Sequence, residues 1–424
     1  MRSSSFVKFW VLCGIGLMGA CGGGGGGNGG GGGGSSAASQ ANLGIARAGL
    51  STMEMDAFNR GRVVFEHDFT PGEGLGPLYN TTSCSHCHNS PVSGGGSPRY
   101  RNFYLTAIGP STQQFAIPGL PSVVVPSFGS GFHITATFRL DGGRAVIPTD
   151  FFGAQISTAQ RNALPMFGVG LFQTISDLAI LANADPDDSD GDGISGRFNT
   201  VMGTVGRFGV KAQTNNIENF VRAPLQNQMG ITTNPLLGNG ATVSLHSGAA
   251  FGSFQVSADP NAPTTDNDGI PDPEMSAGDL SDLIAFSTLL APPTRRASTP
   301  ATDRGEATFS QIGCAKCHIP SLDGSQGPVF AYTDLLLHDL GNGDGISQGA
   351  PQVGATTIPD TTAEFKTAPL WGVSFTRPFM HDGLADTLYE AILLHAGEAT
   401  AIRDAFVALP TADQADLIAF LEIL

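Results

Sequence analysis

Basic residues are scarce in this chain, and their scarcity limits its possible partners. Lysine and arginine number 21 in 424 residues against 37 aspartates and glutamates, so the formal net charge is −16. A chain this acidic lacks the positive surface that nucleic acids and anionic lipids need. We therefore expect no nucleic-acid partner and no electrostatic attachment to a membrane.

Long apolar runs are also missing. The run from Val11 to Ala20 is too short for a transmembrane helix, and it follows Arg2 and Lys8. This pattern predicts a signal peptide over residues 1–20. The run ends at Cys21 in a string that resembles a bacterial lipoprotein cleavage box, so Cys21 would become the lipidated first residue. Ordinary secretion with cleavage nearby is the alternative.

Residues 21–44 are dominated by glycine and cannot form a core. We interpret them as a solvated tether between the lipid and the folded body. The chain is therefore expected in the periplasm or at the cell surface. Its membrane attachment would be through the lipid anchor only, with the bacterial outer membrane as the expected site.

Cysteines are few, which excludes a disulfide framework. Of six, Cys13 lies in the signal segment and Cys21 would carry the lipid. The other four form two Cys-x-x-Cys-His strings, Cys84-Ser85-His86-Cys87-His88 and Cys314-Ala315-Lys316-Cys317-His318. Such strings attach haem c through paired thioethers and supply a proximal histidine ligand. A zinc half-site is the alternative, but no further ligands follow at short spacing. We predict two covalently bound haems.

Two short patterns recur in the same order around these strings. Arg60–Phe65 resembles Arg304–Phe309, and Asp282–Phe286 resembles Asp416–Phe420. We therefore predict a mainly α fold of two cytochrome c-like domains with long loops, each opened and closed by a helix that crosses over a haem. The domains would be 45–290 and 304–424, joined by a linker at 291–303. Residues 100–160 have the composition of loops with short strands, an insertion in the first domain.

The sixth iron ligand decides what each haem can do. For the second haem, the candidates are Met380 and His395, and we favour His395 because the apolar helical face of 389–394 would carry it inward. The alternative is a histidine that only hydrogen-bonds in the core. Trp371 could relay electrons, but packing against the haem is favoured.

The first haem has no equivalent ligand in the stretch before Asp282, where Asn261 stands at the matching place. Four residues could reach the iron without a supporting pattern: His133, His246, Met229 and Met275. An open, reactive first haem is therefore expected. Peroxide cleavage there needs a proton shuttle, for which Gln213 and Glu218 are candidates in a predicted helical stretch between Arg207 and Met229. An ordinary solvated helix face is the alternative.

An acidic loop offers a possible cation site. Asp188, Asp190 and Asp192 have the alternating spacing of the first half of an EF-hand loop, with Gly193 at the turn. Asn199 stands where the full motif has glutamate, so the site would be incomplete. We predict Ca²⁺ here, with a solvated turn as the alternative. A weaker cluster is Asp266, Asp268 and Asp272.

From about residue 60 onward, the chain resembles the bacterial di-haem oxidoreductases, a peroxidase-like family also described as thiol oxidoreductases. The motifs that carry the resemblance are Gly72–Pro77, Gly191–Arg197, Gly206–Gly209, Tyr332–Asp339, Ala368–Gly372 and His381–Ala399. More distantly, the chain is similar to diheme cytochrome c peroxidases and to the diheme enzyme that matures methylamine dehydrogenase. In these families the second haem's ligand follows the His-Asp-Gly motif, which falls on His395. The peroxidase pocket motif is not clear in the N-terminal half.

The resemblance implies an exported enzyme that reduces hydrogen peroxide, or another small oxidant, at the first haem. Electrons would pass through the second haem from a small donor protein, a cytochrome or a cupredoxin, or from a quinol-linked donor. Two alternatives remain. One is a pure electron carrier with both haems six-coordinate, and the other is a haem oxygenase acting on a hydrophobic substrate.

Overall fold

The fold is given by a computed structural model. It describes residues 42–76, 81–97, 103–108, 125–126, 139–141, 144–146, 150–151, 154–201, 203–233, 242–246, 254–257, 269–341, 343, 351–353, 356–357 and 363–424. The signal segment and most of the tether lie outside these residues, as do His133, Asn261, Asp266, Asp268 and the side chain of His246.

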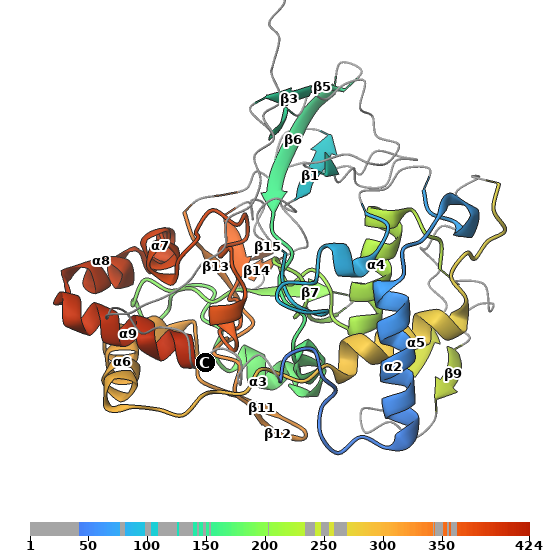
Figure 1. The fold of residues 1–424 in the computed structure, drawn as a ribbon. Helices are drawn as coiled ribbons and strands as arrows, with labels where there is room; N and C mark the ends of the chain where they lie inside the picture. The colour runs from blue at the N-terminus through green and yellow to red at the C-terminus, as the bar shows by residue number, and fades with distance from the viewer. Residues whose placement is uncertain are drawn as a thin grey trace, which may run out of the picture.

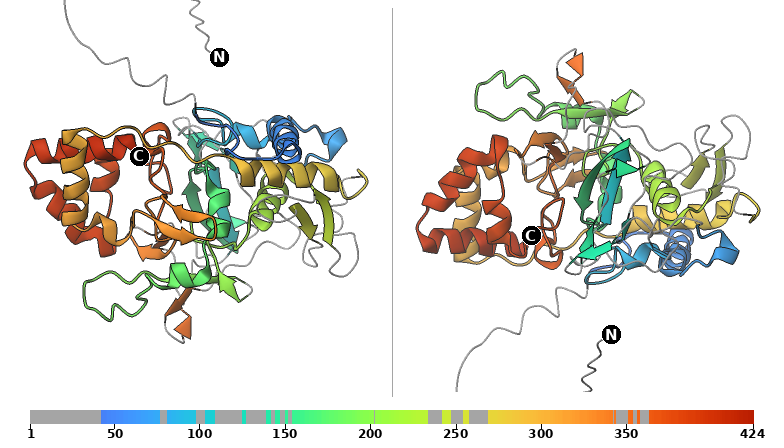
Figure 2. Two further views of the ribbon diagram at one scale, coloured as in Figure 1. Left: turned by 90° about the horizontal axis from the view of Figure 1, so that it is seen from below. Right: turned by 90° about the horizontal axis from the view of Figure 1, so that it is seen from above.

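The regular structure is mainly helical with short strands, and two crossing helix pairs dominate it. The pairs are α2 (Thr52–Glu66) with α5 (Ala277–Leu289), and α6 (Pro300–Gln311) with α9 (Thr411–Ile423). Figure 1 shows α2 and α5 at one end of the molecule and α6 and α9 at the other, and Figure 2 shows the same separation from below and above. The helices predicted from the two recurring patterns are thus present and paired.

The two crossings use the same residue types at equivalent positions, which explains the repeated sequence pattern. A Cβ atom on Gly61 would lie 1.8 Å from the carbonyl oxygen of Asp282, and one on Gly305 would lie 2.0 Å from that of Asp416. Only glycine allows backbones to approach this closely. The neighbouring arginines pair with the same aspartates at 2.6 and 2.7 Å. Phenylalanine pairs fill both crossings, with ring centroids 4.8 and 5.4 Å apart.

Four further helices complete the helical part: α3 (Asp177–Leu181), α4 (Ile217–Met229), α7 (Leu388–Leu393) and α8 (Thr400–Ala408). Helix α3 contacts short strands, α4 lies against α5, and α7 contacts both α8 and α9. Each haem string therefore has a crossed helix pair and an additional helix beside that pair.

The strands are short, and many lie in the insertion after the first haem string. One sheet has the order β2-β1-β6-β5 and contains β1 (Phe103–Ile108), β2 (Val125–Pro126), β5 (Asp150–Phe151) and β6 (Ala154–Arg161). A second has the order β15-β14-β7-β8, formed by β7 (Phe198–Val201), β8 (Thr204–Val205), β14 (Pro351–Val353) and β15 (Thr356–Thr357). This sheet joins residues from both predicted domains, because β7 pairs with β14.

Four two-stranded ribbons are also described. They pair β3 (Arg139–Asp141) with β4 (Arg144–Val146), β9 (Thr242–His246) with β10 (Phe254–Ser257), β11 (Leu322–Gly324) with β12 (Gly327–Val329), and β13 (Leu337–Asp339) with β16 (Glu364–Lys366). The expectation of short strands in residues 100–160 is confirmed for the described part of that segment.

Buried apolar residues form two clusters whose limits differ from the predicted domain boundary. The second cluster contains Phe309, Phe406 and Phe420. The first contains Phe58 and Phe286 but also residues of the second predicted domain, namely Leu322, Val329, Ala331, Leu335, Leu336 and Trp371. The segment 322–336 therefore packs with the first core, so the two predicted domains share an extensive apolar contact.

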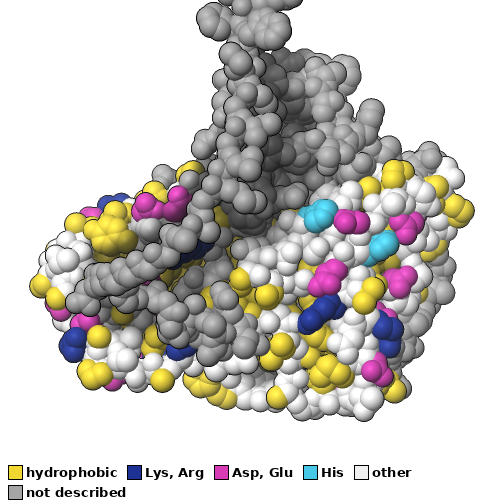
Figure 3. Space-filling view, in the orientation of Figure 1, with side chains coloured by type: hydrophobic (Ala, Val, Ile, Leu, Met, Phe, Trp, Pro, Cys, Tyr) yellow, Lys and Arg dark blue, Asp and Glu magenta, His cyan; other side chains and the backbone are white. Residues whose placement is uncertain are grey.

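None of the described helices combines the length and the apolar character that a membrane span requires. On the face shown in Figure 3, hydrophobic, acidic and basic side chains are interspersed among polar ones.

Candidate haem sites

The first Cys-x-x-Cys-His string lies in a short 3-10 turn, Cys84–His86, that begins after Ser83. The His88 ring stands 6.4 Å from the ring of Phe65, measured between centroids, and its Nδ1 lies 3.2 Å from the carbonyl oxygen of Gly95. Because a carbonyl only accepts, Nδ1 carries the proton and Nε2 keeps its lone pair for a metal. Burial lowers the pKa of His88, which favours this neutral form.

The second string repeats this arrangement after α6. The His318 ring lies 6.5 Å from the Phe309 ring, and its Nδ1 is 3.0 Å from the carbonyl oxygen of Tyr332. Burial raises the pKa of the Cys314 thiol to about 12, as it does that of Cys84. Before a haem is attached, both cysteines would therefore be neutral thiols at physiological pH.

His395 lies near enough to His318 to affect its titration, and a bis-histidine pair stays a prediction. Burial, and then the proximity of His395, lower the pKa of His318 to about 4. His395 follows the end of α7, and its Nδ1 donates to the carbonyl oxygen of Ala391 at 2.7 Å. The Nε2 atoms of both rings thus remain available as ligands. Two imidazoles with available Nε2 atoms and two thiols are a set of donors that would suit a covalently attached, six-coordinate haem.

Met380, the alternative ligand, occupies a different structural position. It has a positive φ of 70° and lies in a turn closed by a bridge between Phe379 and Ala385. Its side chain packs at the edge of the second core. Met380 and His395 are both half-buried, but only the His395 ring is fixed by a hydrogen bond of its own, so the choice between them as ligands stays a prediction.

The turn and helix that precede His395 have a counterpart in the first predicted domain, namely helix α4 and the turn before it. This repeat identifies the residue that corresponds to His395 there. Phe208 and Thr214 form the same bridge as Phe379 and Ala385. Positive φ angles occur at corresponding places, Gly209 and Ala212 in one turn and Met380 and Gly383 in the other. The side chain of Asn216 then accepts from Asn219 N at 2.8 Å, as Thr387 accepts from Glu390 N at 3.1 Å.

Counting from these capping residues identifies the counterpart of His395. His395 is the eighth residue after Thr387, and the eighth after Asn216 is Pro224. Pro224 lies inside α4 and is exposed. By this count, the residue that corresponds to His395 in the first predicted domain is Pro224, whereas the sequence had indicated Asn261. A proline side chain has no lone pair to donate, so it cannot supply a sixth ligand.

The two predicted proton-shuttle residues have other contacts. Gln213 lies in the turn before α4 rather than in a helix, because α4 begins only at Ile217, and its Oε1 accepts from Lys211 N at 3.1 Å. Glu218 forms an ion pair with Arg222 at 2.8 Å. A shuttle role for either residue stays a prediction. Met229 and Met275 are both buried in the first core.

Trp371 joins the two parts of the molecule by stacking on Phe172. Their ring centroids are 5.4 Å apart and the planes are nearly parallel, at 3°. The Lys366 ammonium lies 6.0 Å from the centroid of the same Phe172 ring. Trp371 is buried, which agrees with the packing role favoured for it.

In the acidic loop, the structure brings together a different trio from the predicted one. Ligand oxygens of Asp185, Asp188 and Asp190 lie within 4.8 Å of one another. Asp192 instead pairs with Lys316, inside the second haem string, at 2.8 Å. Two of the three predicted aspartates are therefore grouped, and calcium binding stays a prediction.

A buried charged cluster beside the second haem string was missed in the sequence. His338 is 4% exposed, and both of its ring nitrogens face carboxylates: Nε2 is 2.8 Å from Asp334 and Nδ1 is 3.1 Å from Glu398. Nδ1 also lies 3.6 Å from the Cys317 sulfur. The strings Tyr332–Asp339 and His381–Ala399 contain these residues, but neither string reveals that Glu398 lies against His338.

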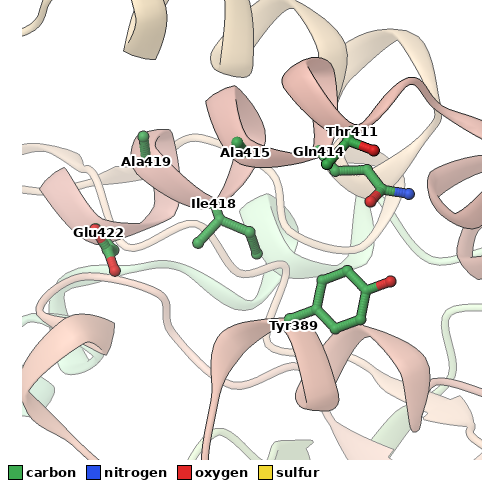
Figure 4. A pocket seen from close by; sticks show the side chains of 7 residues that line it. All are labelled: Tyr389, Thr411, Gln414, Ala415, Ile418, Ala419 and Glu422. Atoms are coloured by element: carbon green, nitrogen blue, oxygen red, sulfur yellow. The ribbon is translucent and has the colours of Figure 1, made fainter.

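A groove of about 300 Å³ lies between α7 and α9. Figure 4 shows Tyr389 facing Ile418 and Gln414 across it. The groove is largely apolar and contains none of the predicted haem residues. It is therefore a surface feature of the second helical group rather than a cofactor site.

Comparisons with known proteins identify the family of the chain. The profile of a family described as "Di-haem oxidoreductase, putative peroxidase" matches residues 141–424, which is more than half of the chain and starts after the first haem string. The cytochrome-c peroxidase IdrP2 of Pseudomonas sp. (strain SCT) is 29% identical over 148 residues, 30% of this chain and 39% of that protein. The methylamine utilization protein MauG of Methylorubrum extorquens is 30% identical over 128 residues, 28% of this chain and 33% of that protein.

The chain thus spans well under half the length of these curated relatives. A solved structure of a variant of the diheme peroxidase BthA from Burkholderia thailandensis aligns with 89% of this chain and 87% of that one, at 16% identity and a TM-score of 0.38.

Proposed function

Because the chain belongs to the di-haem oxidoreductase family, we propose that it is an exported c-type cytochrome that reduces hydrogen peroxide. Peroxide would react at the first haem, held by Cys84, Cys87 and His88, with electrons supplied through the second, held by Cys314, Cys317 and His318. The resemblance inferred from the sequence is confirmed by the family match. When bound, the haems supply one-electron chemistry that no side chain here offers.

The observation that carries this proposal is the contrast between His395 and Pro224. The two residues stand at equivalent places in a repeated turn and helix, yet only His395 can donate an electron pair to iron. His395 would close the second site for electron transfer, whereas the first would keep a position for peroxide. This asymmetry favours an enzyme over a carrier with two closed sites.

The paired helix crossings support two cytochrome c-like units around the haems, although the segment 322–336 of the predicted second unit packs largely with the core of the first. Stacking of Trp371 on Phe172 connects the units, so a role in electron passage between them belongs to the proposal. The net charge of −16 suits a basic cytochrome or cupredoxin as donor. Export and lipid attachment rest on the N-terminal residues alone.

Introducing a histidine at position 224, where it could ligate the first haem, tests the proposal. Pro224→His should convert the first haem to a low-spin form and remove peroxide turnover by the partially reduced protein. Ala223→His, one residue earlier on α4, is the matched control and should retain turnover. His395→Ala should impair donor-driven turnover while peroxide still binds at the first haem.

Two results would argue against an enzyme. A Pro224→His variant with unchanged spectra and unchanged turnover would show that this position does not face the first haem. A wild-type protein that never reacts with peroxide after partial reduction would instead be an electron carrier.

A further inference from the structure

The His338 ring is held between two carboxylates, and this geometry makes the ring a fixed positive charge. Asp334 and Glu398 approach opposite ring nitrogens at 2.8 and 3.1 Å, and a carboxylate accepts from a nitrogen that bears a proton. Both nitrogens are therefore donors, and the ring is an imidazolium. Burial lowers the pKa of His338, but Asp334, the contact with Cys317 and Glu398 together raise this pKa well above its usual value.

Other contacts hold the carboxylates in place. Asp334 Oδ1 accepts from Leu336 N at 2.9 Å, within the chain segment that leads to His338. Glu398 accepts from the backbone and the hydroxyl of Ser195, and Arg197 lies 3.6 Å from it. Arg197 also pairs with the buried Glu364. The side chains of His338 and Asp334 are 5% and 1% exposed, so water screens their charges weakly.

The position of this charge points to the second cofactor. His338 Nδ1 lies 3.6 Å from the Cys317 sulfur, one of the two atoms that would carry the haem. A cation at this distance from the attachment point stabilises the reduced haem, which has one positive charge fewer than the oxidised form. Neither Cys317 nor the segment that carries His338 supplies an iron ligand, so the effect is electrostatic.

We propose that His338 is a positioning residue whose fixed charge, held by Asp334 and Glu398, raises the reduction potential of the second haem. The inference deepens the proposed function, because it rests on the attachment of a haem at Cys314 and Cys317. A bis-histidine haem is electron-rich, and the buried imidazolium would keep its potential high enough to accept electrons from a small donor.

The test is a spectroelectrochemical titration of the full-length, haem-loaded protein at fixed pH. His338→Gln should lower the second-haem potential, with an approximately tenfold smaller equilibrium constant for reduction, or ~59 mV. Glu398→Gln removes a negative charge from the same cluster and should shift the potential the other way. Ser195→Ala deletes a hydrogen bond to Glu398 without changing a charge and should leave the potential near the wild-type value.

Opposite shifts in the two charge variants would support the inference, because a purely structural role would not produce them. Unchanged potentials in both variants would overturn it. If His338→Gln does not fold, the sign of the Glu398→Gln shift decides. The haem content of the wild type, measured by pyridine haemochrome, separates this inference from the proposed function: no haem at the second string would defeat the function itself.

Discussion

At the scale of single residues, burial of the Lys366 amine lowers the free energy of unfolding by an amount that depends on pH. Burial lowers the pKa of Lys366 to about 8, while nearby Asp334 opposes the shift. Below pH 8 the folded chain must hold this ammonium in an apolar environment, where its closest acceptor is the Thr367 carbonyl oxygen at 3.4 Å. Between pH 8 and the usual lysine range the folded chain releases the proton and the unfolded chain keeps it, so stability rises with pH.

Lys366→Met should therefore raise the free energy of unfolding at pH 7 by about 2–3 kcal/mol. The gain should shrink as the pH rises above 8 and be absent near pH 10.5. Denaturant titrations at several pH values provide the measurement. Lys316→Met, at an exposed site paired with Asp192, is the control and should show no gain. A stability gain that is independent of pH would contradict the interpretation that the buried Lys366 ammonium destabilises the fold.

Residue by residue, the sequence alone is enough to propose the covalent haem positions, because the spacing of the Cys-x-x-Cys-His strings is itself the chemical requirement. His395 could be inferred because it is local to one helix. His338 could not be interpreted, since its two carboxylate partners come from different segments and only the fold brings Glu398 to it. Pro224 has no chemical signal of its own and is informative only through its structural counterpart.

At the scale of elements, the helix crossings depend on two glycines. Gly305→Ala would place a Cβ 2.0 Å from the backbone oxygen of Asp416 and should separate α6 from α9. We expect a loss of more than about 3 kcal/mol in the free energy of unfolding. Gly278→Ala on α5 is the control, because its Cβ would meet nothing closer than 3.6 Å. Equal effects of the two substitutions in chemical denaturation would refute the close-approach argument.

The acidic loop allows a second element-scale prediction. If Asp185, Asp188 and Asp190 hold Ca²⁺, chelation should lower the melting temperature of the wild type, because a cation bound only to the folded state stabilises it. Asp188→Ala with Asp190→Ala should abolish this sensitivity, and Asp187→Ala, at an exposed neighbour outside the trio, should retain it. A melting temperature indifferent to chelator would identify the loop as a solvated turn.

The crossing helices were predictable because short glycine and phenylalanine patterns repeat around them. A helical stretch that contains α4 was also predicted, but its equivalence to α7 was not, since the capping residue is asparagine in one copy and threonine in the other and the following segments differ in length. Asp192 was predicted as a cation ligand from spacing alone, and spacing could not reveal that tertiary contact brings Lys316 to it as an ion-pair partner.

At the scale of the whole molecule, the two units are less separate than the sequence indicates. β7 pairs with β14, and Gln160 and Asn162 at the end of β6 donate to backbone oxygens of Asp382 and Pro378. The first unit's insertion thus contacts the turn that precedes α7 and His395. Sequence patterns locate each unit but not this shared surface, because its contacts join residues far apart in the chain, by 222 and 216 positions for the two hydrogen bonds.

The central claim is that one haem site is open and the other is closed by His395. Electron paramagnetic resonance of the oxidised, as-purified protein tests it most directly, with cyanide as a probe of the open position. The account predicts one high-spin haem that becomes low-spin with cyanide and one low-spin bis-histidine haem that does not change. Two low-spin haems that both ignore cyanide would contradict it.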